Sequence, residues 1–277
     1  MVVLFDACTV INMVHIDEGE FLLKQLRGLE FQVCKTVYDE ISTNIFNKFK
    51  YTIPYPEKEK KEIDVKLNNI RSHIYNNQHY LDFCDDVKTA TNYSKSNGEF
   101  HSTVLAAYIN TFQKVFVHIY TDDRPALKEF LPFLSRNQIG SIGDSVDLLV
   151  LLYRHNEAFN RNDLKKYLSK LFAEYAGVIA ELEKVMMSYE IPKLLVRNQK
   201  LRTKLAEIKK AIADLNVTSL RKIYLELPGD KASYGTLFEL LKKYDDFFKK
   251  NITGEYLEKI KSYVKYVDSE PFYKWAN

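Results

Sequence analysis

The segment Val115-Phe116-Val117-His118-Ile119-Tyr120-Thr121-Asp122 is the strongest indication of the fold, because a run of strand-forming residues ends there at a carboxylate. Val2-Val3-Leu4-Phe5-Asp6 repeats this arrangement at the start of the chain. Short apolar runs of this kind are typical of strands that are buried in a parallel sheet. Because the carboxyl ends of parallel strands meet at one edge, Asp6 and Asp122 are expected to lie close together.

Two further acidic residues stand in similar surroundings. Glu40 ends the segment Val33-Cys34-Lys35-Thr36-Val37-Tyr38-Asp39-Glu40, and Glu99 follows Asn97-Gly98 at the start of an apolar helix. Four like charges at one crevice cannot all stay ionised without cations. The set therefore predicts a divalent metal, and metal-assisted phosphodiester chemistry is the first hypothesis.

The first 150 residues alternate between strand and helix patterns. Val2–Phe5 is predicted to be a buried strand, Thr9–Leu29 a helix, and Phe31–Cys34 a second strand. Thr36 is expected to cap the next helix. The remaining predictions are a polar helix or helix pair in Glu57–Tyr80, a helix at Glu99–Phe112 capped by Asn97, a strand at Val115–Thr121, a helix at Arg124–Ser135, a strand at Gln138–Ile142 and a helix at Ser145–Arg154. This order predicts an α/β fold, with a parallel sheet flanked by helices on both faces.

Beyond about residue 155 the strand patterns disappear. Helices are predicted at Asp163–Tyr189, Lys193–Leu215, Thr218–Leu227, Ser233–Lys250 and Thr253–Val267. The sequence therefore predicts two domains, an α/β domain at 1–155 and an all-helical C-terminal domain at 156–277.

Composition limits the class of protein. Among 277 residues, 46% are hydrophobic and 28% charged, which is ordinary for a globular chain. The three cysteines form no Cys-x-x-Cys pair, so a reducing compartment is expected rather than a disulfide framework or a zinc site. No apolar run approaches the roughly 20 residues of a membrane helix, and the first is too short for a signal peptide. A cytoplasmic protein without membrane contact is expected.

The net charge of +3 is unevenly distributed. Residues 1–150 carry a net −4 and residues 151–277 a net +7, and the segment 193–222 accounts for the whole basic excess. We expect this segment to hold an RNA backbone through Lys200, Arg202, Lys204, Lys209 and Lys210. An ordinary amphipathic helix with a lysine-rich solvent side explains the pattern equally well. Docking to an acidic partner protein, such as an inhibitor, is a third reading.

Taken together, the acids and their neighbours resemble the PIN-domain nucleases. The matching pieces are Leu4-Phe5-Asp6-Ala7-Cys8-Thr9-Val10-Ile11, Val37-Tyr38-Asp39-Glu40-Ile41, Asn97-Gly98-Glu99 with Leu105-Ala106-Ala107 behind it, and Tyr120-Thr121-Asp122-Asp123. The resemblance covers about the first 155 residues. It rests on the order and apolar contexts of the pieces, since no single piece is specific.

The resemblance implies a Mg²⁺- or Mn²⁺-dependent endoribonuclease that hydrolyses RNA, with a toxin-like or defence role among its expected settings. Asp6, Glu40, Glu99 and Asp122 would be the catalytic and metal-binding acids. Hard divalent cations choose carboxylate oxygens, which agrees with this set. Arg124 could hold a phosphate, although surface pairing is the simpler role for it.

The sequence departs from the family pattern at one position and leaves one choice open. Family members often carry a small hydroxyl or amide residue two positions after the first Asp, where this chain has Cys8. Thr9 could supply a hydroxyl from the next position. Asp39 and Asp123 lie beside two of the chosen acids and could exchange roles with them.

Two rival functions remain at this stage. One is a structure-specific DNA nuclease. The other is a catalytically silent PIN-like scaffold that binds RNA or protein through the helical tail. A homodimer is compatible with each of them.

Overall fold

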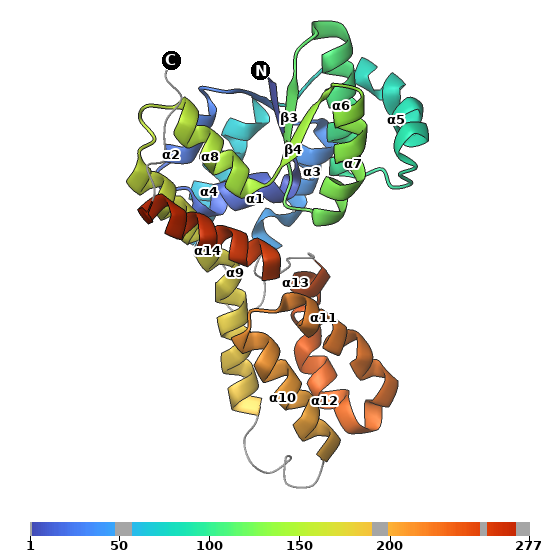
Figure 1. Cartoon of the computed structure of the whole chain (residues 1–277), viewed down its shortest axis with the longest axis vertical. Coiled ribbons are helices and arrows are strands. Elements are labelled where there is room, and N and C mark those ends of the chain that lie inside the picture. The colour runs from blue at the N-terminus through green and yellow to red at the C-terminus, as the bar shows by residue number, and fades with distance from the viewer. Residues whose placement is uncertain (1, 48–56, 190–198, 250–253, 270–277) are drawn as a thin grey trace. The chain divides into compact units, whose positions relative to one another are not determined.

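The computed structural model describes residues 2–47, 57–189, 199–249 and 254–269 (Figure 1). These residues form two compact units, the first ending at Leu168 and the second comprising Ser169–Ser269. The units part within helix α9 (Arg161–Tyr189), whereas the predicted boundary at residue 155 falls at the end of helix α8 (Ser145–His155).

The first unit contains a four-stranded, wholly parallel sheet in the order β2-β1-β3-β4. Its strands are β1 (Val2–Phe5), β2 (Glu30–Gln32), β3 (Val117–Tyr120) and β4 (Gly140–Gly143). The predicted parallel sheet is therefore confirmed, with β1 at its predicted bounds and the other three strands shorter than expected. The second strand lies at Glu30–Gln32 instead of Phe31–Cys34, because Val33 leaves the sheet to bridge Ile74.

Helices cover both faces of this sheet. The chain passes from β1 to β2 through α1 (Ala7–Ile16) and α2 (Phe21–Leu26), and moves in the opposite direction from β2 to β3. Right-handed crossovers in opposite directions place their helices on opposite faces. Figure 1 shows α2 and α8 on one side of β3 and β4, with α3 (Lys35–Asn44), α6 (Gly98–Gln113) and α7 (Arg124–Arg136) on the other.

The prediction of a single helix at Thr9–Leu29 is wrong. The segment forms two helices, α1 and α2, separated by a turn in which Gly19 and Glu20 adopt φ angles of 57° and 61°. Asp17 causes the break, because its carboxylate accepts hydrogen bonds from the backbone N–H groups of Leu22 at 2.7 Å and Leu23 at 3.4 Å. A carboxylate at the start of α2 satisfies donors that a continuous helix would have used internally.

Three other helix boundaries differ from the predictions. Thr36 does not cap α3, which begins one residue earlier at Lys35. Glu57–Tyr80 becomes α4 (Glu57–Arg71) and the 3₁₀ helix η2 (Gln78–Phe83), followed by α5 (Cys84–Thr91). Ser233–Lys250 is divided into α12 (Lys231–Lys242) and α13 (Asp245–Lys249). The predicted capping of α6 by Asn97 is confirmed, since its Oδ1 accepts from Phe100 N at 3.3 Å.

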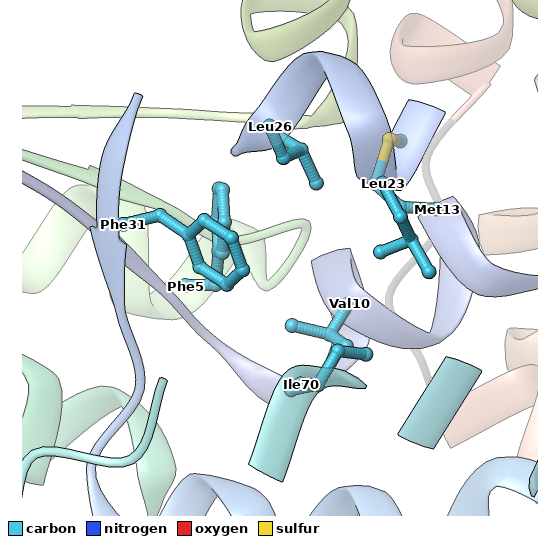
Figure 2. Close-up of a pocket in the computed structure, with 7 residues that line it drawn as sticks. All are labelled: Phe5, Val10, Met13, Leu23, Leu26, Phe31 and Ile70. Atoms are coloured by element: carbon cyan, nitrogen blue, oxygen red, sulfur yellow. The ribbon is translucent and has the colours of Figure 1, made fainter. Parts of the chain in front are cut away.

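The core between β1, β2 and the helices α1, α2 and α4 is closely packed. Figure 2 shows the apolar side chains that line a small void within it: Phe5, Val10, Met13, Leu23, Leu26, Phe31 and Ile70. The void measures about 10 Å³, barely room for one water molecule, and its apolar lining keeps it dry. Because Phe5 is fixed in this packing, the residue that follows it, Asp6, has a defined position.

The described residues of the second unit form only helices, as the sequence predicts. They are the later part of α9, α10 (Gln199–Ala213), α11 (Val217–Glu226), the short η3 (Leu227–Asp230), α12, α13 and α14 (Gly254–Ser269). The predicted helix Lys193–Leu215 is confirmed over α10, and its first residues lie outside the described ranges. In the described part of the chain, no helix combines the length and apolar character that crossing a bilayer requires.

Candidate functional site

The connections of the sheet define where a site belongs. β1 and β3 are neighbours, yet the chain leaves β1 toward β2 and leaves β3 toward β4, in opposite directions. Such a switch point opens a crevice at the carboxyl ends of the two strands. Asp6 directly follows β1, and its backbone N–H donates to Tyr120 O at 2.9 Å. Asp6 and the Thr121-Asp122 segment therefore lie at this crevice.

Asp6 is buried, with an exposed fraction of 1%. Its Oδ2 accepts hydrogen bonds from Cys8 Sγ at 2.8 Å and from Thr121 Oγ1 at 3.0 Å. Its Oδ1 is buried and has no hydrogen-bond partner. Burial raises the pKa of Asp6, and the bonds from Cys8 and Thr121 lower it in part. A buried carboxylate oxygen without a donor is costly for the metal-free protein.

Gly98 brings Asp6 and Glu40 together. A β-carbon placed on Gly98 would lie 2.7 Å from Glu40 Oε2 and 2.9 Å from Asp6 Oδ1. Glu40 Oε1 also accepts from Gly98 N at 2.9 Å. The absence of a side chain at residue 98 is therefore what allows the two carboxylates to approach one another.

Glu99 is the third acid at this point. It stands in the first turn of α6, and its Oε2 is buried without a hydrogen-bond partner. Burial and then the charge of Asp6, with smaller effects from Asp123 and Glu40, raise the pKa of Glu99 to about 8. Burial and Asp6 likewise raise the pKa of Glu40. The structure thus places three of the four acids predicted from the sequence close enough for their charges to interact.

Asp122, the fourth predicted acid, is held by other groups. Its Oδ1 accepts from Ser145 N at 2.8 Å, and its Oδ2 accepts from Ser145 Oγ at 2.5 Å and from Asn12 Nδ2. Its backbone N–H donates to Cys8 Sγ at 3.0 Å, and its charge raises the pKa of Cys8, after burial and Asp6. Asp122 therefore adjoins the site through Cys8, with its carboxylate bonded to the start of α8 and to α1.

Asp123 acts on the site through its charge. Its charge raises the pKa of Glu99 and that of Tyr93, a residue whose hydroxyl bonds Asn97 beside Glu99. Its Oδ1 also caps α7 by accepting from Ala126 N at 3.3 Å. Asp39, the other alternative acid, is exposed and paired with Lys35, away from the three carboxylates.

Cys8 occupies the position at which a hydroxyl or amide residue is expected. Its Sγ lies within hydrogen-bond distance of Asp6 Oδ2, Asp122 N and Thr121 Oγ1, so it links the ends of β1 and β3. Thr9 does not supply this link, because its Oγ1 is buried and makes no hydrogen bond. Sequence reasoning missed Gly98 and Tyr93 as parts of this site. The triplet Asn97-Gly98-Glu99 was the available signal for Gly98.

The residues fit a hard divalent cation in chemical type. Within the described ranges, no three Asp, Glu, His or Cys side chains are already arranged to hold one metal ion together. Its three acids nevertheless offer carboxylate oxygens, and two of these, Asp6 Oδ1 and Glu99 Oε2, are buried without a hydrogen-bond donor. Oxygen ligands with excess negative charge are what Mg²⁺ and Mn²⁺ select.

The predicted phosphate-binding cations lie on α7 and on α10. Arg124 lies 3.8 Å from the buried carboxylate of Asp144. Lys204 Nζ donates to both Glu207 and Glu226 at 2.8 Å. The other four are exposed along α10 in the second unit: Lys200, Arg202, Lys209 and Lys210. These four side chains are accessible to solvent.

Comparison of the chain with protein-family models, with curated proteins and with solved structures finds no match. The carboxylates around Gly98 are therefore the ground on which a function is assigned.

Proposed function

We propose that the first unit is a PIN-like, Mg²⁺- or Mn²⁺-dependent endoribonuclease that hydrolyses RNA phosphodiester bonds. The observation that carries this proposal is the convergence of Asp6, Glu40 and Glu99 on Gly98 at the switch point of a parallel sheet. The PIN-like pattern of the first 155 residues and the exposed cations of α10 support RNA as the substrate. A toxin-like or defence role is part of this proposal.

Asp6, Glu40 and Glu99 would hold the ion, with Asp123 adding negative charge beside Glu99. A bound divalent cation supplies Lewis acidity and neutralises charge that develops on a phosphate. Cys8 and Thr121 orient Asp6 by bonding only its Oδ2, which leaves Oδ1 directed to other ligands. Gly98 N orients Glu40 in the same way, by donating a hydrogen bond to its Oε1.

The decisive experiment is cleavage of a mixed RNA pool and a single-stranded DNA by purified protein, with EDTA, Mg²⁺ or Mn²⁺. We expect metal-dependent cutting of RNA that Asp6→Asn abolishes. Asp39→Asn is the matched control, because this acid is adjacent to Glu40 in sequence but exposed and paired with Lys35. Cutting of DNA alone would replace the proposal with the DNA nuclease.

A catalytically silent scaffold is the second candidate. It is favoured by one observation. Both carboxylate oxygens of Asp122 already accept hydrogen bonds from Ser145 or Asn12, so this acid is engaged in the protein's own structure. If neither polymer is cut and Mn²⁺ fails to raise the melting temperature, the scaffold explains the protein better than the nuclease does.

A further inference from the structure

An exposed aromatic surface lies on η2 and α6, apart from the carboxylates. Phe112 has an exposed fraction of 65% and Leu81 one of 38%, while Phe83 and Tyr108 are half-buried. We call these four residues the aromatic surface. Glu99 and Phe112 stand near opposite ends of α6, so the helical rise separates them by about 20 Å. The aromatic surface is thus a feature separate from the proposed nuclease site.

The three rings of this surface hold one another in place. The ring centroids of Tyr108 and Phe112 lie 4.7 Å apart, those of Phe83 and Tyr108 5.6 Å apart, and those of Phe83 and Phe112 6.0 Å apart. The Tyr108 hydroxyl also accepts a hydrogen bond from Asn77 Nδ2 at 3.0 Å. Rings that are fixed before binding lose little conformational entropy when a partner covers them, and exposed aromatic anchors are typical of binding hot spots.

The charges beside the aromatic surface are mostly negative. Asp82, Asp85 and Asp86 are exposed on η2 and α5, and both elements pack against α6. Figure 1 shows α5 beside α6. His79 Nδ1 on η2 lies 3.7 Å from Asp82 Oδ2. The one lysine of these three elements, Lys88, has its Nζ 5.6 Å from the ring of the buried Phe100. Lys114 follows directly after α6. Aromatic rings beside carboxylates attract cations and repel phosphates.

We propose that the aromatic surface docks a cationic amphipathic helix of a partner protein. Apolar side chains of the helix would cover Phe112 and Leu81, and its lysines or arginines would meet Asp82, Asp85 and Asp86. The same acids disfavour RNA on this surface. They also disfavour a two-fold contact between copies of this chain, in which each acidic group would face its own image.

The test uses the full-length chain carrying Asp6→Asn, so that it reports binding independently of the proposed nuclease activity. The probe is a fluorescent synthetic helix of leucine and lysine, about 18 residues long, since shorter peptides form marginal helices. A peptide with glutamate in place of lysine is its counterpart. Fluorescence anisotropy should show binding of the lysine peptide and no binding of the glutamate peptide.

Two variants locate the binding. Phe112→Ala and the double change Asp85→Lys/Asp86→Lys should each weaken binding by about tenfold, the loss of one hot-spot contact. Leu225→Ala is the matched control, because Leu225 is 63% exposed on α11 of the second unit and should leave binding unchanged. Thermal melts of all variants check that these exposed substitutions leave the fold intact.

Four results would overturn the proposal. The lysine peptide could fail to bind, or it could bind equally well to Phe112→Ala and the wild-type surface. A single-stranded RNA oligonucleotide could instead lose affinity on Phe112→Ala, which would assign the surface to nucleobases. Sedimentation could show a dimer that Phe112→Ala dissociates, which would assign it to a second copy of the chain.

Discussion

Asp6 Oδ1 and Glu40 Oε2 meet across the α-carbon of Gly98, each within 3 Å of the position that a β-carbon would occupy there. The first carboxylate belongs to the residue that follows β1 and the second lies on α3, and α6 begins beside both of them. No hydrogen bond satisfies Asp6 Oδ1 at this contact. The protein thus tolerates a costly juxtaposition of like charges, which a cation would relieve.

Gly98→Ala should disrupt this contact. The new methyl group would displace the Glu40 and Asp6 carboxylates, and overpacking of this kind typically costs about 1–3 kcal/mol. We expect a lower melting temperature and loss of RNA cleavage. Gly177→Ala is the matched control, because Gly177 lies in α9 with no atom within 4 Å of an added β-carbon, and the change should stabilise the protein by roughly 0.5–1 kcal/mol. Equal melting of both variants would show that the contact at Gly98 is not tight.

Mn²⁺ should stabilise the folded protein. An ion that binds only the folded state adds about 2.7 kcal/mol at a hundredfold excess over its Kd. Differential scanning fluorimetry in EDTA and in Mn²⁺ measures the shift, which Asp6→Asn should abolish and Asp39→Asn should retain. A shift that survives in Asp6→Asn would place the ion elsewhere on the molecule.

Metal-free stability should fall as the pH rises from about 4.5 to about 8. The pKa of Glu99 is about 8 in the folded protein against 4.5 for a solvated glutamate, so between these values the folded state retains a proton that the unfolded chain has released. The contribution is fully present below pH 4.5 and is lost as the pH passes 8. Chemical denaturation across this range in EDTA measures the fall, and Glu99→Gln should flatten it. An unchanged slope in Glu99→Gln would assign the pH dependence to other groups.

Asp122→Asn should affect the stability of the metal-free protein, whereas Asp123→Asn should affect its response to Mn²⁺. The Asp122 carboxylate accepts from Ser145 N and Ser145 Oγ, so its replacement should lower the melting temperature in EDTA by the cost of impaired buried hydrogen bonds, about 1–3 kcal/mol. Asp123→Asn should preserve the cap of α7, because asparagine caps helices as well as aspartate does. It should instead weaken the response to Mn²⁺, since the Asp123 charge acts on Glu99.

The opposite pattern in the same two melts, with Asp122→Asn stable but unresponsive to Mn²⁺, would restore Asp122 as the fourth ligand. Ser145→Ala provides a separate check on the Asp122 network, because it removes the hydroxyl donor without altering any acid.

The parallel sheet and the helical second unit could be predicted from the sequence. Both follow from local patterns: buried runs such as Val2–Phe5 alternate with amphipathic helices, and α10 carries its apolar residues at helical spacing. The presence of Asp6 directly after a strand is equally local. These features depend on neighbours within a few residues, which is the range over which periodicity is informative.

Which acids lie together could be learned only from the packing of elements that are distant in sequence. Asp122 and Asp123 are adjacent in sequence, yet Asp122 accepts a hydrogen bond from Ser145, whereas the charge of Asp123 raises the pKa of Glu99. Consecutive side chains beyond a strand point in different directions. The contact of Asp6 with Glu40 needed Gly98, a residue remote from both in sequence. Such relationships arise from the packing of β1, α3 and α6 against one another, and no local pattern contains them.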